Sequence, residues 1–321
     1  MEYVGIQTQQ SRNNFRTLLL LLLFPCLVAG LLLLFSYLLT WLSYNTDPEV
    51  DIAAMTMELF WQILPYVTGG VIFWFVIAYF INTSLISAAT GAKPLERKEN
   101  MRVYNLVENL CMSKGMKMPK INIIYDDSLN AYASGINERG YTVTLSKGII
   151  EKLNDEELEG VIAHELTHIR NRDVRLLIVS IVFVGIFAML AQVALRSVYY
   201  SSRVRSRDSK GNGAAVVILV ALVVAALGYL FSSLMRFAIS RKREYMADAG
   251  AAEMTKNPQA LASALRKISE DPDIEAVTRN DVAQLFIEHP HTQKESAFSG
   301  LSGLFATHPP IKKRIAVLEQ F

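Results

Sequence analysis

One five-residue stretch combines two residue types that bind metals with one that can accept a proton: His164-Glu165-Leu166-Thr167-His168. On a helix, histidines four positions apart project from the same face and can reach a common ion. Glu165 lies beside the first histidine, where it can take the proton of a water molecule that the ion activates. The chain has only 5 histidines and 30 acidic residues, so about 0.007 chance matches to this pattern are expected. The stretch therefore predicts the catalytic helix of a zinc-dependent hydrolase.

A catalytic zinc site with two histidines needs a third protein ligand and an open fourth position. Asn171 and Val174 stand where a metzincin carries its glycine and third histidine, so that class is excluded. Glu244 and Asp248, four residues apart, are the alternative source. One of them can bind zinc while the other hydrogen-bonds a ligand imidazole. By itself such a pair is more typical of a solvated helix face, and spacing does not say which residue is the ligand.

The segment that carries the histidines has the start signals of a helix. Asn154 is a good N-cap, Glu157 follows at the capping-box position, and three acidic residues in the first turn complement the helix dipole. Periodicity and turn residues predict the remaining elements. Helices are expected over 97–114, 236–254, 258–268 and 309–320, strands over 120–125, 131–134 and 141–145, and a long polar loop with one short helix over 271–307.

The composition is too apolar for an ordinary soluble enzyme, with 51% hydrophobic and 19% charged residues. The net charge of +2 offers no basic field for nucleic acid. Two cysteines, Cys26 and Cys111, exclude a disulfide framework and a cysteine-based zinc module.

The apolar residues are concentrated in four blocks of about 20 residues or more, long enough to span a hydrocarbon core of ~30 Å. They cover 18–41, 59–82, 176–195 and 213–235 and contain no charged residue or histidine, which argues against a transporter or channel. The blocks divide the chain into a membrane region (1–92), a first catalytic part (93–175), a hydrophobic hairpin (176–235) and a second catalytic part (236–321).

The charges around the first two blocks predict the orientation of the chain. No Lys or Arg occurs between Thr17 and Ala92, whereas Lys93, Arg97 and Lys98 follow the second block. The positive-inside rule then places the catalytic parts in the cytoplasm. The loop between the third and fourth blocks is also basic, against the rule for a crossing pair, so these two blocks either cross the membrane or form a re-entrant pair.

These features resemble the HtpX-like membrane zinc metallopeptidases, relatives of the CAAX prenyl endopeptidases, over essentially the whole chain. The matching segments are Asn130–Gly135, Glu157–Arg172, Arg243–Asp248 and Thr307-His-Pro-Pro followed by Arg314. The resemblance implies one zinc ion per chain, bound by His164, His168 and Glu244.

The resemblance also implies the roles of further residues. Glu165 would be the catalytic base, Asp248 would support a ligand histidine, and His308 would stabilise the oxyanion. Arg314 would hold the surrounding carboxylates. The substrate would lie along an edge strand of Asn130, Ala131, Tyr132, Ala133 and Ser134, where main-chain pairing is independent of sequence. Asp173 has no assigned role, and His289 and His291 are interpreted as loop residues.

The expected fold is a multi-pass α-helical membrane protein with a cytoplasmic α+β zincin-like metallopeptidase domain, mostly helical, whose small sheet carries the substrate-binding edge strand. The expected function is a zinc-dependent endopeptidase of the cell membrane, which cleaves membrane-associated or misfolded proteins on the cytoplasmic side. The resemblance implies protein quality control under stress. The expected partners are polypeptide substrates, membrane proteins among them, and the lipid bilayer, with no nucleic acid; the oligomeric state stays open.

Two alternatives remain at this point. A CAAX prenyl-type endopeptidase is the nearer one, although that family is longer and has more spans. A non-catalytic zinc-binding membrane scaffold is the other, and it would need neither a base beside its ligand nor an open coordination position.

Overall fold

The structure is a computed structural model, and it describes the following residues: 6–44, 47, 49–179, 182, 186–187, 218, 220–230, 241–271, 286–287 and 309–321. The chain divides into two compact units. The sheet-containing unit comprises residues 1–17, 79–179 and 237–321, and the apolar unit comprises 18–78 and 180–236.

Two helices of 39 residues, α1 (Ile6–Tyr44) and α2 (Ile52–Thr90), contain the first two predicted apolar blocks. By length and composition, Ser11–Tyr44 and Ile52–Ser84 could each cross a membrane. Both helices are longer than the predicted blocks, because the blocks were defined by apolar residues and the helices also include polar residues at their ends.

The described part of the apolar unit also includes some of the third and fourth blocks. Phe187 packs against Phe24, with ring centroids 5.8 Å apart, and Val220–Leu230 is a short apolar helix. A Cβ atom at Gly228 would overlap the Phe187 ring, so a glycine is needed at this contact. Most of the third block and about half of the fourth lie outside the described residues, and so does nearly all of the predicted loop 271–307.

The sheet has four strands in the order β1-β2-β4-β3. The strands are β1 (Lys93–Pro94), β2 (Lys120–Ile124), β3 (Ala131–Ser134) and β4 (Thr142–Ser146). β2 and β4 are parallel, and the other two pairs are antiparallel. The three predicted strands are confirmed, β4 with a shift of one residue. The two-residue β1 was not predicted, because it is too short to show an alternating pattern.

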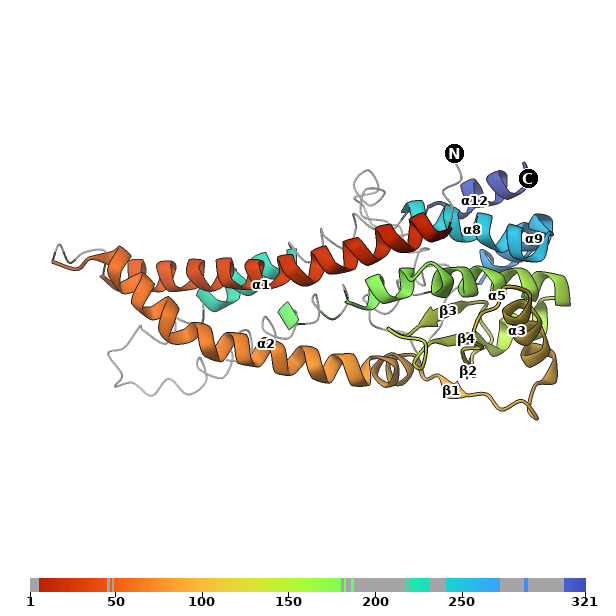
Figure 1. The fold of residues 1–321 in the computed structure, drawn as a ribbon, viewed down its shortest axis with the longest axis horizontal. Helices are drawn as coiled ribbons and strands as arrows, with labels where there is room; N and C mark the ends of the chain where they lie inside the picture. The colour runs from red at the N-terminus through yellow and green to blue at the C-terminus, as the bar shows by residue number, and fades with distance from the viewer. Residues whose placement is uncertain are drawn as a thin grey trace. The chain divides into compact units, whose positions relative to one another are not determined.

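The helices of the sheet-containing unit are α3 (Met101–Ser113), α4 (Lys147–Lys152), α5 (Asp155–Arg170), α8 (Arg241–Thr255), α9 (Pro258–Ile268) and α12 (Ile311–Leu318). All but the six-residue α4 were predicted, and their described ends shift by a few residues. The predicted start of α8, 236–240, lies outside the described residues. α5 lies between the sheet and the pair α8 and α9 (Figure 1). α12 contacts α8 and α9.

α5 is the central helix of this unit, and its surroundings explain its sequence. The capping box of Asn154 and Glu157 is present as predicted. Eleven of the 16 residues of α5 are buried, because neighbours cover it on several sides. Small residues allow this close packing: a Cβ atom at Gly160 would lie 3.2 Å from Leu261 of α9, and one at Gly250 of α8 would overlap Thr167.

Candidate metal centre

His164 and His168 occupy one face of α5 on successive turns. Their Nε2 atoms lie 3.2 Å apart and their rings are nearly perpendicular, at 88°. The His164 side chain is completely buried, whereas 14% of the His168 side chain is exposed. The pair therefore presents two imidazole nitrogens to one point at the edge of the core.

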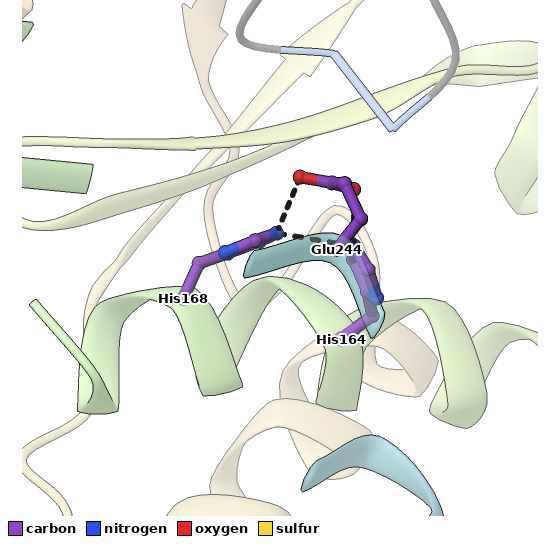
Figure 2. A group of neighbouring side chains, drawn as sticks. All are labelled: His164, His168 and Glu244. Atoms are coloured by element: carbon purple, nitrogen blue, oxygen red, sulfur yellow. Dashed lines mark hydrogen bonds and ion pairs between the residues drawn. The ribbon is translucent and has the colours of Figure 1, made fainter. Parts of the chain in front are cut away.

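Glu244, in the first turn of α8, brings a carboxylate to the same point (Figure 2). Its Oε2 atom lies 3.6 Å from His164 Nε2, and its Oε1 atom lies 3.6 Å from His168 Nε2. Ligand atoms that are 2.0–2.1 Å from a tetrahedral zinc ion lie ~3.3 Å from one another. Two imidazoles and one carboxylate at this spacing are a donor set that fits zinc.

Each histidine has a carboxylate at its other ring nitrogen. Asp248 Oδ1 lies 3.0 Å from His164 Nδ1, and Asp173 Oδ2 lies 3.2 Å from His168 Nδ1. A carboxylate at Nδ1 favours the tautomer that carries its proton there and leaves Nε2 as the metal-binding nitrogen. From the sequence, Asp173 has no assigned role. The feature of the sequence that could have indicated this contact is that Asp173 follows His168 by five residues, just beyond the end of α5.

The two carboxylates are held by residues from distant parts of the chain. Arg314 of α12 donates from Nε to Asp248 Oδ2 at 2.9 Å and from Nη2 to Asp248 Oδ1 at 2.7 Å. Asn13 of α1 donates from Nδ2 to Asp173 Oδ1 at 2.5 Å. Helices from both ends of the sequence thus orient the two imidazoles.

Burial and ion pairing perturb the titration of this cluster. Burial alone would lower the pKa of His164, but its bonds with Asp248 and Glu244 outweigh burial and raise the pKa to about 9. Burial would raise the pKa of Asp248, yet the Arg314 guanidinium holds it below its usual value. Burial raises the pKa of Glu165, although the two imidazoles oppose the shift.

Two of the three candidate ligands, His168 and Glu244, line a cavity of about 20 Å³. Glu165, His168 and Glu244 line it together with Asp173, and the Glu165 residue is only 2% exposed. This volume accommodates about one water molecule. The buried acid next to the ligands therefore faces a space of the size that a single attacking water needs.

The comparison with known proteins decides the family. Residues 97–321 match the peptidase family M48. The chain belongs to peptidase family M48. It is 75% identical to a protease HtpX homolog from Bacteroides fragilis, over 100% of both chains. It is 40% identical to a protease HtpX homolog from Dictyoglomus turgidum, over 77% of this chain and 80% of that one. The predicted HtpX-like resemblance is confirmed, and the protein is a metalloprotease that acts on polypeptide substrates.

Among solved structures, the chain is similar to Ste24p from S. mikatae, with a TM-score of 0.47 and 18% identity. The similarity covers 89% of this chain and 62% of that one, so the chain spans less than two thirds of that protein's length. The full-length identity to HtpX homologs favours neither the CAAX prenyl alternative nor the non-catalytic scaffold.

M48 metallopeptidases are zinc-dependent in general. The predicted substrate strand of this chain corresponds to β3, at the edge of the sheet. Ala133 of this strand lines the cavity beside Glu165. Its neighbours are already paired within the chain: Tyr132 forms a bridge with Phe286, and Ile287 N donates to Ala131 O at 2.9 Å. The chain itself thus occupies part of this edge.

The end residues of the predicted substrate segment hold the strand rather than face the cavity. Asn130 is fully buried, and its Oδ1 accepts the N–H of Ala131 at 3.0 Å. Ser134 Oγ lies 2.5 Å from Thr142 Oγ1. His308, the predicted oxyanion residue, lies outside the described part of the chain, as do His289 and His291.

Proposed function

We propose that this M48 protein is a membrane-anchored zinc endopeptidase that hydrolyses peptide bonds of membrane-associated or misfolded proteins on the cytoplasmic side. One observation carries the proposal: His164, His168 and Glu244 converge, and the last two line a water-sized cavity together with the buried Glu165.

His164, His168 and Glu244 would hold the zinc ion, with Asp248 and Asp173 orienting the imidazoles. When bound, zinc supplies a Lewis acid that polarises the scissile carbonyl and acidifies water. Glu165 accepts a proton from the attacking water, and the water oxygen forms the new bond to the carbonyl carbon. Glu165 then passes this proton to the leaving nitrogen as the peptide C–N bond breaks.

The other expected residues act on the substrate and on the ligands. An extended substrate would pair with the β3 edge at Ala133, next to the part that residues 286–287 occupy. His308 would stabilise the oxyanion of the tetrahedral intermediate. Arg314 would keep Asp248 ionised against His164.

The membrane assignment rests on the apolar stretches of α1 and α2. The cytoplasmic orientation rests on the absence of Lys and Arg from 18–91, followed by Lys93, Arg97 and Lys98. A role in quality control under stress follows from the resemblance to HtpX-like proteases.

The test compares wild type with Glu165→Gln in vesicles that also contain a labelled, destabilised membrane protein. Zinc content should be unchanged, and the cleavage rate should fall about 10²–10⁴-fold, the range expected for loss of a general base. Glu156→Gln, an exposed change on the same helix, is the matched control. His168→Ala should lose zinc as well as cleavage. Wild-type cleavage by Glu165→Gln would refute the assignment, and a zinc-binding protein that cleaves nothing would favour the scaffold.

A further inference from the structure

A second cavity of about 510 Å³ lies in the sheet-containing unit, at the C-terminal end of α5. Its charged and aromatic lining comprises Lys117, Glu138, Tyr141, Arg170, Arg172 and Arg175. The lining thus holds four cationic side chains and one acidic one, and Arg170 also lies 3.9 Å from Glu253. The volume falls within the ~300–1,000 Å³ range of small-molecule sites. None of these residues belongs to the proposed catalytic machinery.

Arg172 occupies a backbone position that arginine seldom takes. It follows the C-cap residue Asn171 and has a φ of 61°, in the left-handed region where glycine or asparagine usually ends a helix. Because such a conformation is unfavourable for a residue with a side chain, it indicates a functional constraint at this position. Here an arginine replaces the expected glycine and adds its guanidinium to the cavity lining.

Arg175 contributes a donor with no visible acceptor. Its Nε atom is buried and has no hydrogen-bond partner among the residues that the structure describes. A buried guanidinium N–H without an acceptor is unfavourable, and an anionic oxygen is the partner that satisfies it best. Burial raises the pKa of Tyr141, while Arg172 and Arg175 act to lower it, so both guanidinium charges lie near the Tyr141 hydroxyl.

Arg172 and Arg175, which line the cavity, both lie close to the start of an apolar stretch. Arg172 donates to Asn14 Oδ1 at 3.2 Å, and Asn14 lies near the start of the apolar stretch Ser11–Tyr44. Arg175 directly precedes Leu176, where the third apolar block begins.

A turn that lines the cavity contacts the second apolar stretch. Asn137 lines the cavity, and its Nδ2 donates to Tyr79 Oη at 3.3 Å. Thr83 Oγ1 donates to Gly140 O at 3.4 Å in the same turn. Tyr79 and Thr83 are in the last two turns of the apolar stretch Ile52–Ser84. Residues around the cavity thus hydrogen-bond to terminal residues of both apolar stretches.

We propose that this cavity binds the phosphate of an anionic phospholipid headgroup at the membrane surface. Arginine matches phosphate oxygens with paired, charge-assisted hydrogen bonds, and basic pockets beside membrane spans are suited to anionic headgroups. The inference rests on the proposed membrane placement and does not depend on catalysis. A lipid in this cavity would contact the residues that follow Asp173, and so would anchor the metal-bearing helix at the bilayer.

The experiment measures binding of short-chain lipids to the full-length protein in nonionic detergent. Dioctanoyl phosphatidylglycerol should bind at least about tenfold more tightly than dioctanoyl phosphatidylcholine, which has no net charge, and than glycerol 3-phosphate, which has no acyl chains. Equal binding of the two lipids would overturn the proposal. Equal binding of phosphatidylglycerol and glycerol 3-phosphate would overturn the assignment to a lipid.

The variants assign the binding to the cavity. Arg172→Gln with Arg175→Gln should weaken phosphatidylglycerol binding at least about tenfold. Arg97→Gln with Arg266→Gln, which removes two exposed arginines, should leave binding within about twofold. Lys117→Gln changes an exposed lining residue and should also weaken binding, so the test survives if the arginine variant fails to fold. Wild-type binding by both cavity variants would refute the site.

The outcome separates this proposal from the proposed protease mechanism. Glu165→Gln should bind phosphatidylglycerol like wild type. Loss of cleavage in that variant with unchanged lipid binding would support both proposals. Cleavage without lipid preference would overturn the lipid site alone.

Discussion

Arg314 clamps Asp248 with two hydrogen bonds, at 2.9 and 2.7 Å, and both side chains are almost completely buried. Asp248 in turn lies 3.0 Å from His164 Nδ1. The residue that orients a candidate zinc ligand on α5 therefore comes from α8 and is held by the last helix of the chain. The buried charges in this series of contacts depend on one another, because removing one charge leaves its partner unpaired.

The substitution Arg314→Gln tests this dependence. It should leave Asp248 buried without its counter-ion and lower the unfolding temperature of the detergent-solubilised protein by roughly 10 °C. Arg266→Gln, which removes an arginine from an exposed pair with Glu319, should lower it by no more than about 2 °C. Equal effects of the two variants would contradict the buried clamp.

Asp173→Asn tests a residue whose role emerged from the structure. Loss of the carboxylate at His168 Nδ1 should weaken zinc binding about 10–100-fold in a chelator competition assay. The matched control is Asp127→Asn, since the Asp127 side chain is 84% exposed and pairs with Lys147. The prediction is wrong if both variants retain wild-type zinc affinity.

Gly250 tests whether close packing of α5 and α8 is needed to bring Glu244 to the histidines. A Cβ atom at Gly250 would overlap Thr167 Cγ2 and would lie 2.9 Å from Thr167 Oγ1. Gly250→Ala should therefore weaken zinc binding and destabilise the fold by about 1–3 kcal/mol. Thr167→Ala removes both atoms, so the double variant should recover most of the loss. A double variant as impaired as Gly250→Ala would show that this contact does not set the helix spacing.

Glu157 tests the pH dependence of stability. Burial would raise the pKa of this carboxyl, but hydrogen bonds from Lys267, Ser263 and the Asn154 N–H outweigh burial and hold it below the usual 4.5. A carboxyl with a lowered folded-state pKa stabilises the protein above its unfolded-state pKa, and the stabilisation disappears as pH falls through the folded-state value.

The corresponding variant is Glu157→Gln. It should cost about 2 kcal/mol near neutral pH, through the lost ion pair and the weakened capping box. The difference from wild type should shrink below about pH 4.5 in melts recorded from pH 7 to pH 3. Glu151→Gln, at an exposed position, should show a small difference at every pH. If the stability difference between wild type and Glu157→Gln does not change with pH, the charge of Glu157 is not the cause of the lost stability.

Local features of the sequence were sufficient for much of the fold. The capping box at Asn154, the long apolar helices and the shared face of His164 and His168 depend on contacts within a few residues of each other. Periodicity and capping report such contacts directly. Local residue types and turns marked the three strands, although β2 and β4 pair across 22 residues. Resemblance over the whole chain supplied the family, which the comparison then confirmed.

The arrangement of the carboxylates depended on contacts between distant segments. Spacing left Glu244 and Asp248 as equal candidates, and packing of α8 on α5 brings Glu244 to both Nε2 atoms and Asp248 to an Nδ1 atom. Asp173 acquires its role only in the folded chain, where it contacts both Asn13 and His168. A helical repeat specifies which residues share a face. Only the packing of a second helix specifies which residues contact that face. Here this packing depends on the small size of Gly250 and on the buried clamp of Arg314.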